Sequence, residues 1–302
     1  MTQPTAQPTA QPMTPALDDE HQPISFPRAR TVRLPGRGDC FVRIAPTPPD
    51  APDAPTLLLL HGWTATADIN WGTAYGVLSE KYGLVAPDLH GHGRGPRRRR
   101  RFRLEDCAHD VAALAEELGL ESAVVVGYSM GGTVAQLLWR HHPSLVDSMV
   151  LCATAATFRE SRREQARFAG LWAAALAARA LPRRWLRSIG RRLVEEHVKS
   201  VPGEWVVGEM RRHEPLRLLQ AGRELGVFDS RRWLGSVDVP VSCVVTARDA
   251  VVSPRRQLEL AELVGAGTTG KVVEVSGTHT VCLRHPQKWL PPLVEAVDAV
   301  AA

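Results

Sequence analysis

A serine flanked by glycines lies near the middle of the 302-residue chain, in the sequence GYSMGG at residues 127–132. An apolar β-branched run precedes this sequence and a run with helical spacing follows it, so Ser129 occupies a sharp turn between a strand and a helix. Small neighbours let such a strained turn form, and the turn lifts the hydroxyl above the sheet. The pattern predicts a nucleophilic serine at Ser129. The alternative is a glycine-rich turn with an incidental serine.

A serine hydroxyl needs a base to take its proton. His279 lies in the loop SGTHT just after the last predicted strand, at the same sheet edge as Ser129, where open α/β folds build their sites. Asp249, in TARDA, follows another predicted strand and would orient the imidazole. Asp229 and Asp238 precede that strand and are expected on the wrong side. The alternatives are a helix cap for Asp249 and a loop histidine without a role for His279.

The remaining histidines are expected to have no part in the chemistry. His90 and His92 lie in a glycine-rich loop, where we expect them to cap or to be solvated, as we do for His141 and His142 at a helix end. His213 belongs to an inserted segment.

Strands and helices alternate along most of the chain. Expected strands, the first two forming a hairpin, are 31–34, 40–45, 56–60, 84–87, 123–126, 149–152, 239–246 and 272–275, and expected helices are 71–81, 104–118, 133–141, 255–264 and 286–300. This order predicts an α/β fold with a doubly wound, mostly parallel sheet.

Three kinds of segment are expected. Residues 1–23 form a Pro/Thr/Gln-rich tail that is predicted to be disordered. Residues 24–154 and 234–302 form the α/β core. Residues 155–233, which hold 17 Lys+Arg against 9 Asp+Glu and show no clear strands, are expected to be a helical cap.

The composition argues against several classes of protein. The chain has 37 Lys+Arg and 32 Asp+Glu, a net charge of +5, and no nucleic-acid-binding motif, so no nucleic-acid partner is expected. Its five cysteines are scattered and never spaced as CxxC, which argues against a disulfide scaffold or a structural zinc site. No apolar run approaches about 18 residues and no signal peptide is present, so the expected compartment is the cytoplasm.

The order Ser129, Asp249, His279 and the serine turn resemble the α/β-hydrolase family, together with HGW at 61–63 and DLHGHG at 88–93. The resemblance implies that the residue after His-Gly donates the second backbone N–H of an oxyanion hole, so that Trp63 joins Met130. The N–H of Met130 also lies at a helix N-terminus, which favours developing negative charge. Serine, and not aspartate, at the turn is similar to the acyl-transfer members.

These residues predict a serine hydrolase that cleaves carboxylic esters of apolar acyl groups through an acyl-enzyme, with thioesters or amides as the alternative substrates. Its partner would be a small acyl ester, and no metal or organic cofactor is implied. The alternatives are a specialised member of the fold, such as a perhydrolase-like or C–C-bond hydrolase, and a non-catalytic ligand-binding member.

Two basic segments remain open to interpretation. The apolar stretch 168–181 is flanked by arginines and is expected to be a lid helix, with weak contact to an anionic membrane as the alternative. Trp172, Trp185 and Trp205 are candidates for the pocket lining, with core packing as the simpler account. The run Arg97–Arg101 is expected to be a solvated loop, with an anion contact as the alternative.

Overall fold

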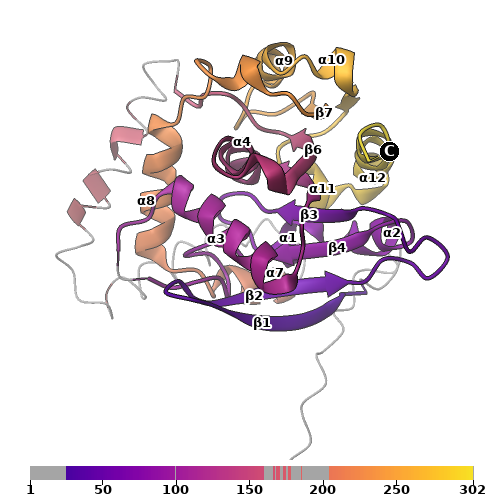
Figure 1. Cartoon of the computed structure of the whole chain (residues 1–302). Coiled ribbons are helices and arrows are strands. Elements are labelled where there is room, and N and C mark those ends of the chain that lie inside the picture. Colours follow the sequence, from indigo (N-terminus) through magenta and orange to yellow (C-terminus); the bar gives the residue numbers. More distant parts are fainter. Residues whose placement is uncertain are drawn as a thin grey trace, which may run out of the picture.

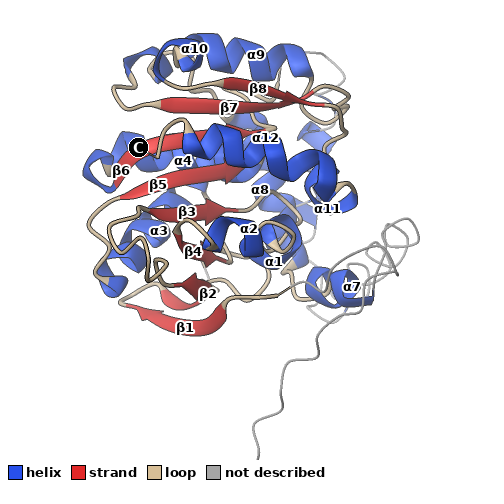
Figure 2. Cartoon of the chain, turned by 90° about the vertical axis from the view of Figure 1, so that its right-hand side faces the viewer, coloured by secondary structure: helices blue, strands red, loops and turns tan. Residues whose placement is uncertain are grey.

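Eight strands form one mixed sheet at the centre of the protein. The computed structural model describes residues 25–98, 100–159 and 204–301, with a few isolated positions between 166 and 185. The strand order is β1-β2-β4-β3-β5-β6-β7-β8. The pairs β1–β2 and β2–β4 are antiparallel and all later pairs are parallel (Figure 2). The sequence-based prediction of the fold class is therefore confirmed.

The strands are numbered in the order in which they occur along the chain. Their bounds are β1 Arg28–Leu34, β2 Gly38–Ala45, β3 Thr56–Leu60, β4 Gly83–Pro87, β5 Ala123–Tyr128, β6 Val146–Cys152, β7 Val241–Thr246 and β8 Val272–Val275. The helices between them are α1 Ala67–Trp71, α2 Tyr75–Ser79, α3 Leu104–Leu118, α4 Met130–His141, α7 Glu204–Met210, α8 Pro215–Val227, α9 Pro254–Leu263, α10 Ala266–Thr269, α11 Val281–Arg284 and α12 Pro286–Asp298.

Helices cover both faces of the sheet and create two apolar cores (Figure 1). One core contains Leu58 and Val125 and is covered by α3 and α4. The other contains Leu57 and Val124 and is covered by α1, α2 and α12. Successive residues of a strand point to opposite faces, so an entirely apolar strand such as β3 or β5 feeds both cores. This explains the unbroken apolar runs in the sequence.

One expected helix is divided in two. In place of a single helix over 71–81, the chain forms α1 and α2 with a turn between them. The first helix starts early because the Thr66 hydroxyl accepts a hydrogen bond from the Ile69 N–H at 3.3 Å. Around the serine turn, β5 extends to Tyr128 and α4 begins at Met130, so a single residue, Ser129, separates strand from helix.

The described part of the expected cap is helical and packs on the core. Helices α7 and α8 carry it, and Ala221 and Leu225 of α8 join the same apolar core as α3 and α4. Among the residues that the structure describes, no helix is long and apolar enough to cross a membrane. The division of the chain into tail, core and cap stays a prediction, because residues 1–24 and most of 160–203 lie outside the described residues.

Candidate active site

The serine turn is a strained backbone segment that neighbouring strands hold in place. Ser129 has φ 53° and ψ −115°, a conformation that is costly for a residue with a side chain. Its N–H donates to Cys152 O at the end of β6, at 2.9 Å. Its carbonyl accepts from the Thr154 hydroxyl at 2.8 Å and from Gly132 N–H at 2.9 Å. These bonds fix the position of the Ser129 side chain at the carboxyl end of β5.

The glycines of the turn are required by close packing of backbone on backbone. A Cβ on Gly131 would lie 2.0 Å from Leu60 O of β3, and one on Gly127 would lie 2.5 Å from Gly131 O. Neither neighbour is a flexible side chain that can move aside. Helix α4 therefore approaches the sheet more closely than any side-chain-bearing residue would allow.

Substituting Gly131 by Ala should destabilise the fold by about 3 kcal/mol or more, since overpacking against a fixed backbone costs 1–3 kcal/mol or above. Urea unfolding measures the change. Gly76→Ala is the matched control, because nothing lies within 4 Å of the added Cβ in α2. That control should stabilise the protein by about 0.5–1 kcal/mol. Equal effects of the two substitutions would contradict the close approach.

Three side chains from three different loops meet at this sheet edge. His279 Nε2 lies 3.0 Å from Ser129 Oγ, and His279 Nδ1 lies 2.6 Å from Asp249 Oδ2. Asp249 follows β7 and His279 follows β8, so parallel strands place both loops beside the serine turn. The Asp249 side chain is fully shielded from solvent, whereas the His279 side chain is 18% exposed. Hydrogen bonds thus connect the hydroxyl to the carboxylate through the imidazole.

The Asp249 carboxylate is held as an anion by its surroundings. Oδ1 accepts from the N–H groups of Val251 and Val252 at 2.8 and 2.9 Å. Oδ2 accepts from the Thr246 hydroxyl at 2.7 Å in addition to His279. Burial by itself raises the pKa of Asp249, but the hydrogen bonds and the charge of His279 outweigh it and leave the pKa below its usual value. An ionised Asp249 fixes the proton of His279 on Nδ1 and leaves Nε2 free to accept from Ser129.

The His-Gly-Trp segment lies directly against the serine. A Cβ on Gly62 would be 3.3 Å from Ser129 Cβ, so the backbone at residues 61–65 passes beside Ser129. This segment is here called the oxyanion loop, after the role that the sequence leads us to expect for it. Asn70 Oδ1 accepts from Gly62 N–H at 2.6 Å. His61 Nδ1 donates to Gly62 O at 2.8 Å, and its Nε2 accepts from Leu89 N–H at 2.8 Å. The described residues provide no hydrogen-bond acceptor for the Trp63 N–H.

Several positioning residues were not foreseen from the sequence. Gln257 of α9 binds both Thr246 Oγ1 and Val252 O and thereby surrounds Asp249, and Asn70 bridges the oxyanion loop to Cys282 Sγ at 3.4 Å. The Tyr128 hydroxyl donates to His279 O at 2.8 Å. Each is a buried polar residue within an apolar or helical stretch. A polar residue at such a position is the only signal in the sequence for its role.

The expectation that His90 and His92 cap or are solvated is wrong. Both are buried, at 2% and 0% exposure, and the His92 ring lies between those of His61 and His213, with centroids 5.4 and 5.5 Å away. His90 also stacks on Phe102 with ring centroids 5.6 Å apart. The glycine-rich loop turns inward because α8 covers it, which the local sequence does not reveal.

The arginine run is exposed at Arg97, Arg100 and Arg101, as expected of a solvated loop, but three of its arginines also form ion pairs. Arg98 forms an ion pair with the buried Asp110 of α3, Arg97 pairs with Glu214 at 3.3 Å, and Arg101 pairs with Glu224 of α8 at 2.9 Å. These residues tie the loop after β4 to α3 and to the cap. Arg99 lies outside the described residues.

Of the three candidate tryptophans, the structure describes two. Trp205 packs edge-on against Phe26 with ring centroids 5.9 Å apart, Trp185 is 57% exposed, and Trp172 lies outside the described residues.

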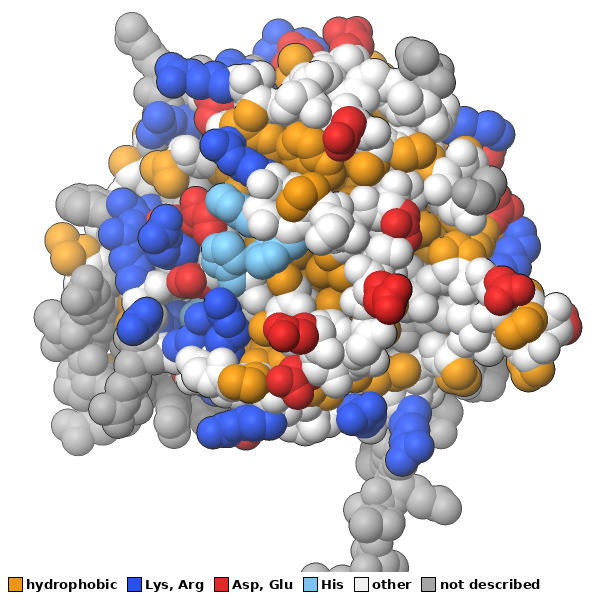
Figure 3. Space-filling model, viewed as in Figure 1, with side chains coloured by type: hydrophobic (Ala, Val, Ile, Leu, Met, Phe, Trp, Pro, Cys, Tyr) orange, Lys and Arg blue, Asp and Glu red, His pale blue; other side chains and the backbone are white. Residues whose placement is uncertain are grey.

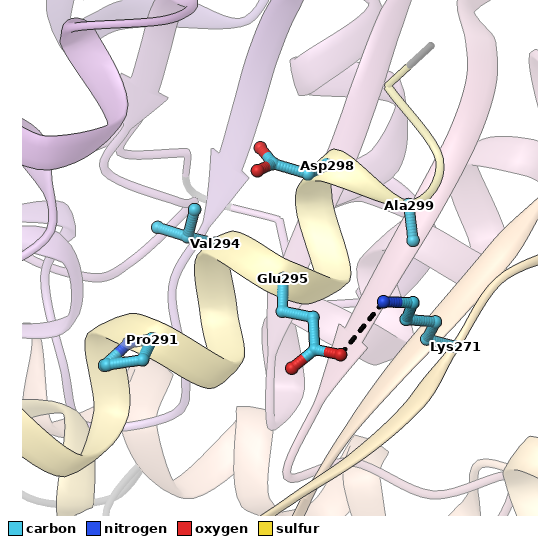
Figure 4. Close-up of a pocket in the computed structure, with 6 residues that line it drawn as sticks. All are labelled: Lys271, Pro291, Val294, Glu295, Asp298 and Ala299. Atoms are coloured by element: carbon cyan, nitrogen blue, oxygen red, sulfur yellow. Dashed lines mark hydrogen bonds and ion pairs between the residues drawn. The ribbon is translucent and has the colours of Figure 1, made fainter.

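Two further surface features lie outside this site. A hollow of about 510 Å³ on α12, beside the Lys271–Glu295 ion pair, contains no residue of the hydrogen-bonded group (Figure 4). His109 of α3 contacts His141 and His142 at the end of α4. Figure 3 shows that histidine side chains gather on one face of the molecule. Within the described part of the chain, no group of His, Cys, Asp or Glu suits a metal ion.

Comparison with known proteins agrees with this architecture. Residues 55–199 match a family model described as the alpha/beta hydrolase fold. The chain is 27% identical to the pimeloyl-[acyl-carrier protein] methyl ester esterase of Sodalis glossinidius over 261 residues, which cover 79% of this chain and 92% of that protein. It is also similar in structure to a bromoperoxidase from Bacillus anthracis, with TM-score 0.72 and 15% identity, over 90% of this chain and 100% of that one.

Other similarities cover only part of the relatives. An uncharacterized protein of Mycobacterium tuberculosis is 29% identical over 110 residues, which span 36% of this chain and 32% of that protein. On the family model, the strand order and the structural neighbours together, the chain has the α/β-hydrolase fold.

Proposed function

We propose that the chain is a serine hydrolase that cleaves carboxylic esters of apolar acyl groups through an acyl-enzyme. The observation that carries the proposal is the pair of distances at His279: 3.0 Å to the Ser129 hydroxyl and 2.6 Å to the Asp249 carboxylate. Both lie within the range that proton transfer and charge stabilisation require. The proposed chemistry uses no metal or organic cofactor.

In the first step, His279 Nε2 takes the proton of Ser129 as Oγ attacks the ester carbonyl. Asp249 stays ionised and stabilises the positive charge that develops on the imidazole. The N–H groups of Trp63 and Met130 would donate to the oxyanion. The close approach of Gly62 to Ser129 and the start of α4 at Met130 support this assignment.

The tetrahedral intermediate then collapses, and His279 gives its proton to the leaving alcohol. A water molecule attacks the acyl-enzyme with His279 again as base, which releases the acid and restores the Ser129 hydroxyl. The alcohol leaves before the water enters, so the same imidazole serves both half-reactions.

An apolar acyl group is supported by the surroundings of the oxyanion loop. The Trp63 side chain packs against the apolar core that contains Met130, Phe158 and Val252. A relative that this chain matches over 92% of that protein's length is named a pimeloyl-[acyl-carrier protein] methyl ester esterase.

Fluorophosphonate labelling combined with a p-nitrophenyl ester series from acetate to decanoate tests the proposal. We expect stoichiometric labelling of Ser129 and measurable turnover with a preference along the series. Labelling without turnover of any ester would favour a specialised reaction, such as that of a perhydrolase-like or C–C-bond hydrolase. A folded protein that shows neither would contradict the enzyme proposal and favour a ligand-binding member of the fold.

A further inference from the structure

The segment between α7 and α8 docks beside the proposed oxyanion hole. Glu214 N–H donates to Gly91 O at 3.3 Å, and Arg97 donates to Arg212 O at 2.7 Å. Gly91 leaves no room for a side chain, because its Cβ would lie 2.5 Å from Arg217 Cβ. This part of the expected cap therefore contacts the core backbone directly at the loop after β4.

His213 of this segment joins two core loops. Its Nδ1 accepts a hydrogen bond from Gly93 N–H at 3.0 Å, so the ring proton resides on Nε2. Nε2 then donates to Thr64 O of the oxyanion loop, at 3.2 Å. The residue is 8% exposed, and burial lowers its pKa to about 3. A neutral imidazole therefore makes both bonds throughout the neutral pH range.

Thr64 is the residue of the oxyanion loop that most needs support. It has φ 60°, a left-handed conformation that is unfavourable for a β-branched residue. Its side chain is exposed, so its own packing cannot hold this conformation. Next to it, Ala65 N–H closes a turn onto Gly62 O at 3.3 Å. Trp63 and Thr64 are the two central residues of this turn, so a change in the conformation of Thr64 would alter the turn that also holds Trp63.

A second bond from the cap reaches the same loop. The indole Nε1 of Trp63 donates to Leu218 O of α8 at 2.9 Å. Consecutive residues, Trp63 and Thr64, are thus bound to cap segments more than 145 positions away in the sequence. Docking of α8 and the shape of the oxyanion loop are linked through these two bonds.

We propose that His213 is a positioning residue of the oxyanion hole: it holds Thr64 in its left-handed conformation and thereby directs the Trp63 N–H toward Ser129. The inference rests on the proposed function, because it assigns the Trp63 N–H to the oxyanion. His213 itself contacts neither the hydroxyl nor the substrate. Its effect passes through the carbonyl of Thr64.

Two substitutions and a control test the proposal. His213→Ala should lower kcat on the best p-nitrophenyl ester about tenfold with KM within twofold, because the oxyanion forms only in the transition state. Adding Thr64→Gly should bring kcat back to within about threefold of the original, since glycine adopts a positive φ without the hydrogen bond from His213. Arg101→Ala, which removes a different contact between the core and α8, should leave kcat unchanged.

Hydrogen exchange gives a readout that does not depend on activity. His213→Ala should speed exchange of the peptide containing residues 62–66 at least tenfold, and Arg101→Ala should not. Unchanged exchange in a folded His213→Ala protein would overturn the proposal that His213 holds Thr64 in place, whether or not the protein is an esterase. Faster exchange with full kcat would overturn the link to the oxyanion. A loss of kcat that Thr64→Gly fails to rescue would equally overturn the route through Thr64.

Discussion

Replacing Ser129 by Ala should lower kcat at least about 10⁴-fold, and replacing His279 as well should lower it little further. Members of a catalytic triad act as one unit, so the loss of one nearly removes the benefit of the others. The distances at His279 make Ser129 and Asp249 parts of a single hydrogen-bonded group. Steady-state kinetics of the two single variants and the double variant, with the best ester of the p-nitrophenyl series, measure this non-additivity.

The fold should survive this substitution. Alanine has the same backbone preferences as serine at φ 53°, and the bonds that hold the turn use the backbone of Ser129. Ser79→Ala, at a half-buried position of α2 that has no contact with this site, is the matched control and should retain full activity. Multiplicative losses in the double variant, or a Ser129→Ala protein within tenfold of the original, would disprove the proposed nucleophile.

Lowering the pH from 7.5 to 5 should remove up to about 8 kcal/mol of folding stability. Four buried histidines have lowered pKa values: about 3 for His61, His92 and His213, and about 4 for His90, with burial as the main cause in each. The unfolded chain takes up protons near pH 6.5 while the folded protein does not, so stability falls as pH falls through this window. Each histidine contributes about 2 kcal/mol at pH 5.

The hydrogen bonds of these rings explain why they resist protonation. His61 Nε2 and His213 Nδ1 each accept from a backbone N–H, Leu89 and Gly93 respectively, and a protonated ring has no acceptor to offer. Charging either ring would leave a buried N–H facing a buried cation. Asp249, whose pKa is lowered, loses its stabilising effect only below about pH 4, its ordinary range, and so does not contribute to the loss above pH 5.

Urea unfolding at pH 7.5, 6 and 5 measures the loss, and two variants assign it. His92→Phe should flatten the pH dependence by about 2 kcal/mol, because it removes one buried ring that must charge on unfolding. His141→Gln, at an exposed position at the end of α4, should leave the slope unchanged. A stability that is constant between pH 7.5 and 5 would show that the buried imidazoles do not control acid unfolding.

Local sequence was sufficient for the sheet and for the three residues that meet at its edge. The apolar runs of β3 and β5 are diagnostic because a strand buried on both faces must be apolar throughout. The glycine-flanked serine lies between a strand and a helix, and Asp249 and His279 lie shortly after two later strands. These positions can be read from the order of elements along the chain. Parallel strands then bring Ser129, Asp249 and His279 to one edge, so their meeting follows from topology.

Only the tertiary structure decided which polar residues support that edge. Asn70 and His213 contact Cys282 and Thr64 across long stretches of sequence, and a hydrogen bond between distant segments leaves no periodic pattern in either. Gln257 reaches Thr246 and Val252 only because α9 folds back over the loop that follows β7. The burial of His92 was likewise decided by the packing of α8 over its loop. Periodicity reports which face of one element is apolar, whereas the partner of a buried polar atom depends on how several elements dock, and that information exists only in the folded chain.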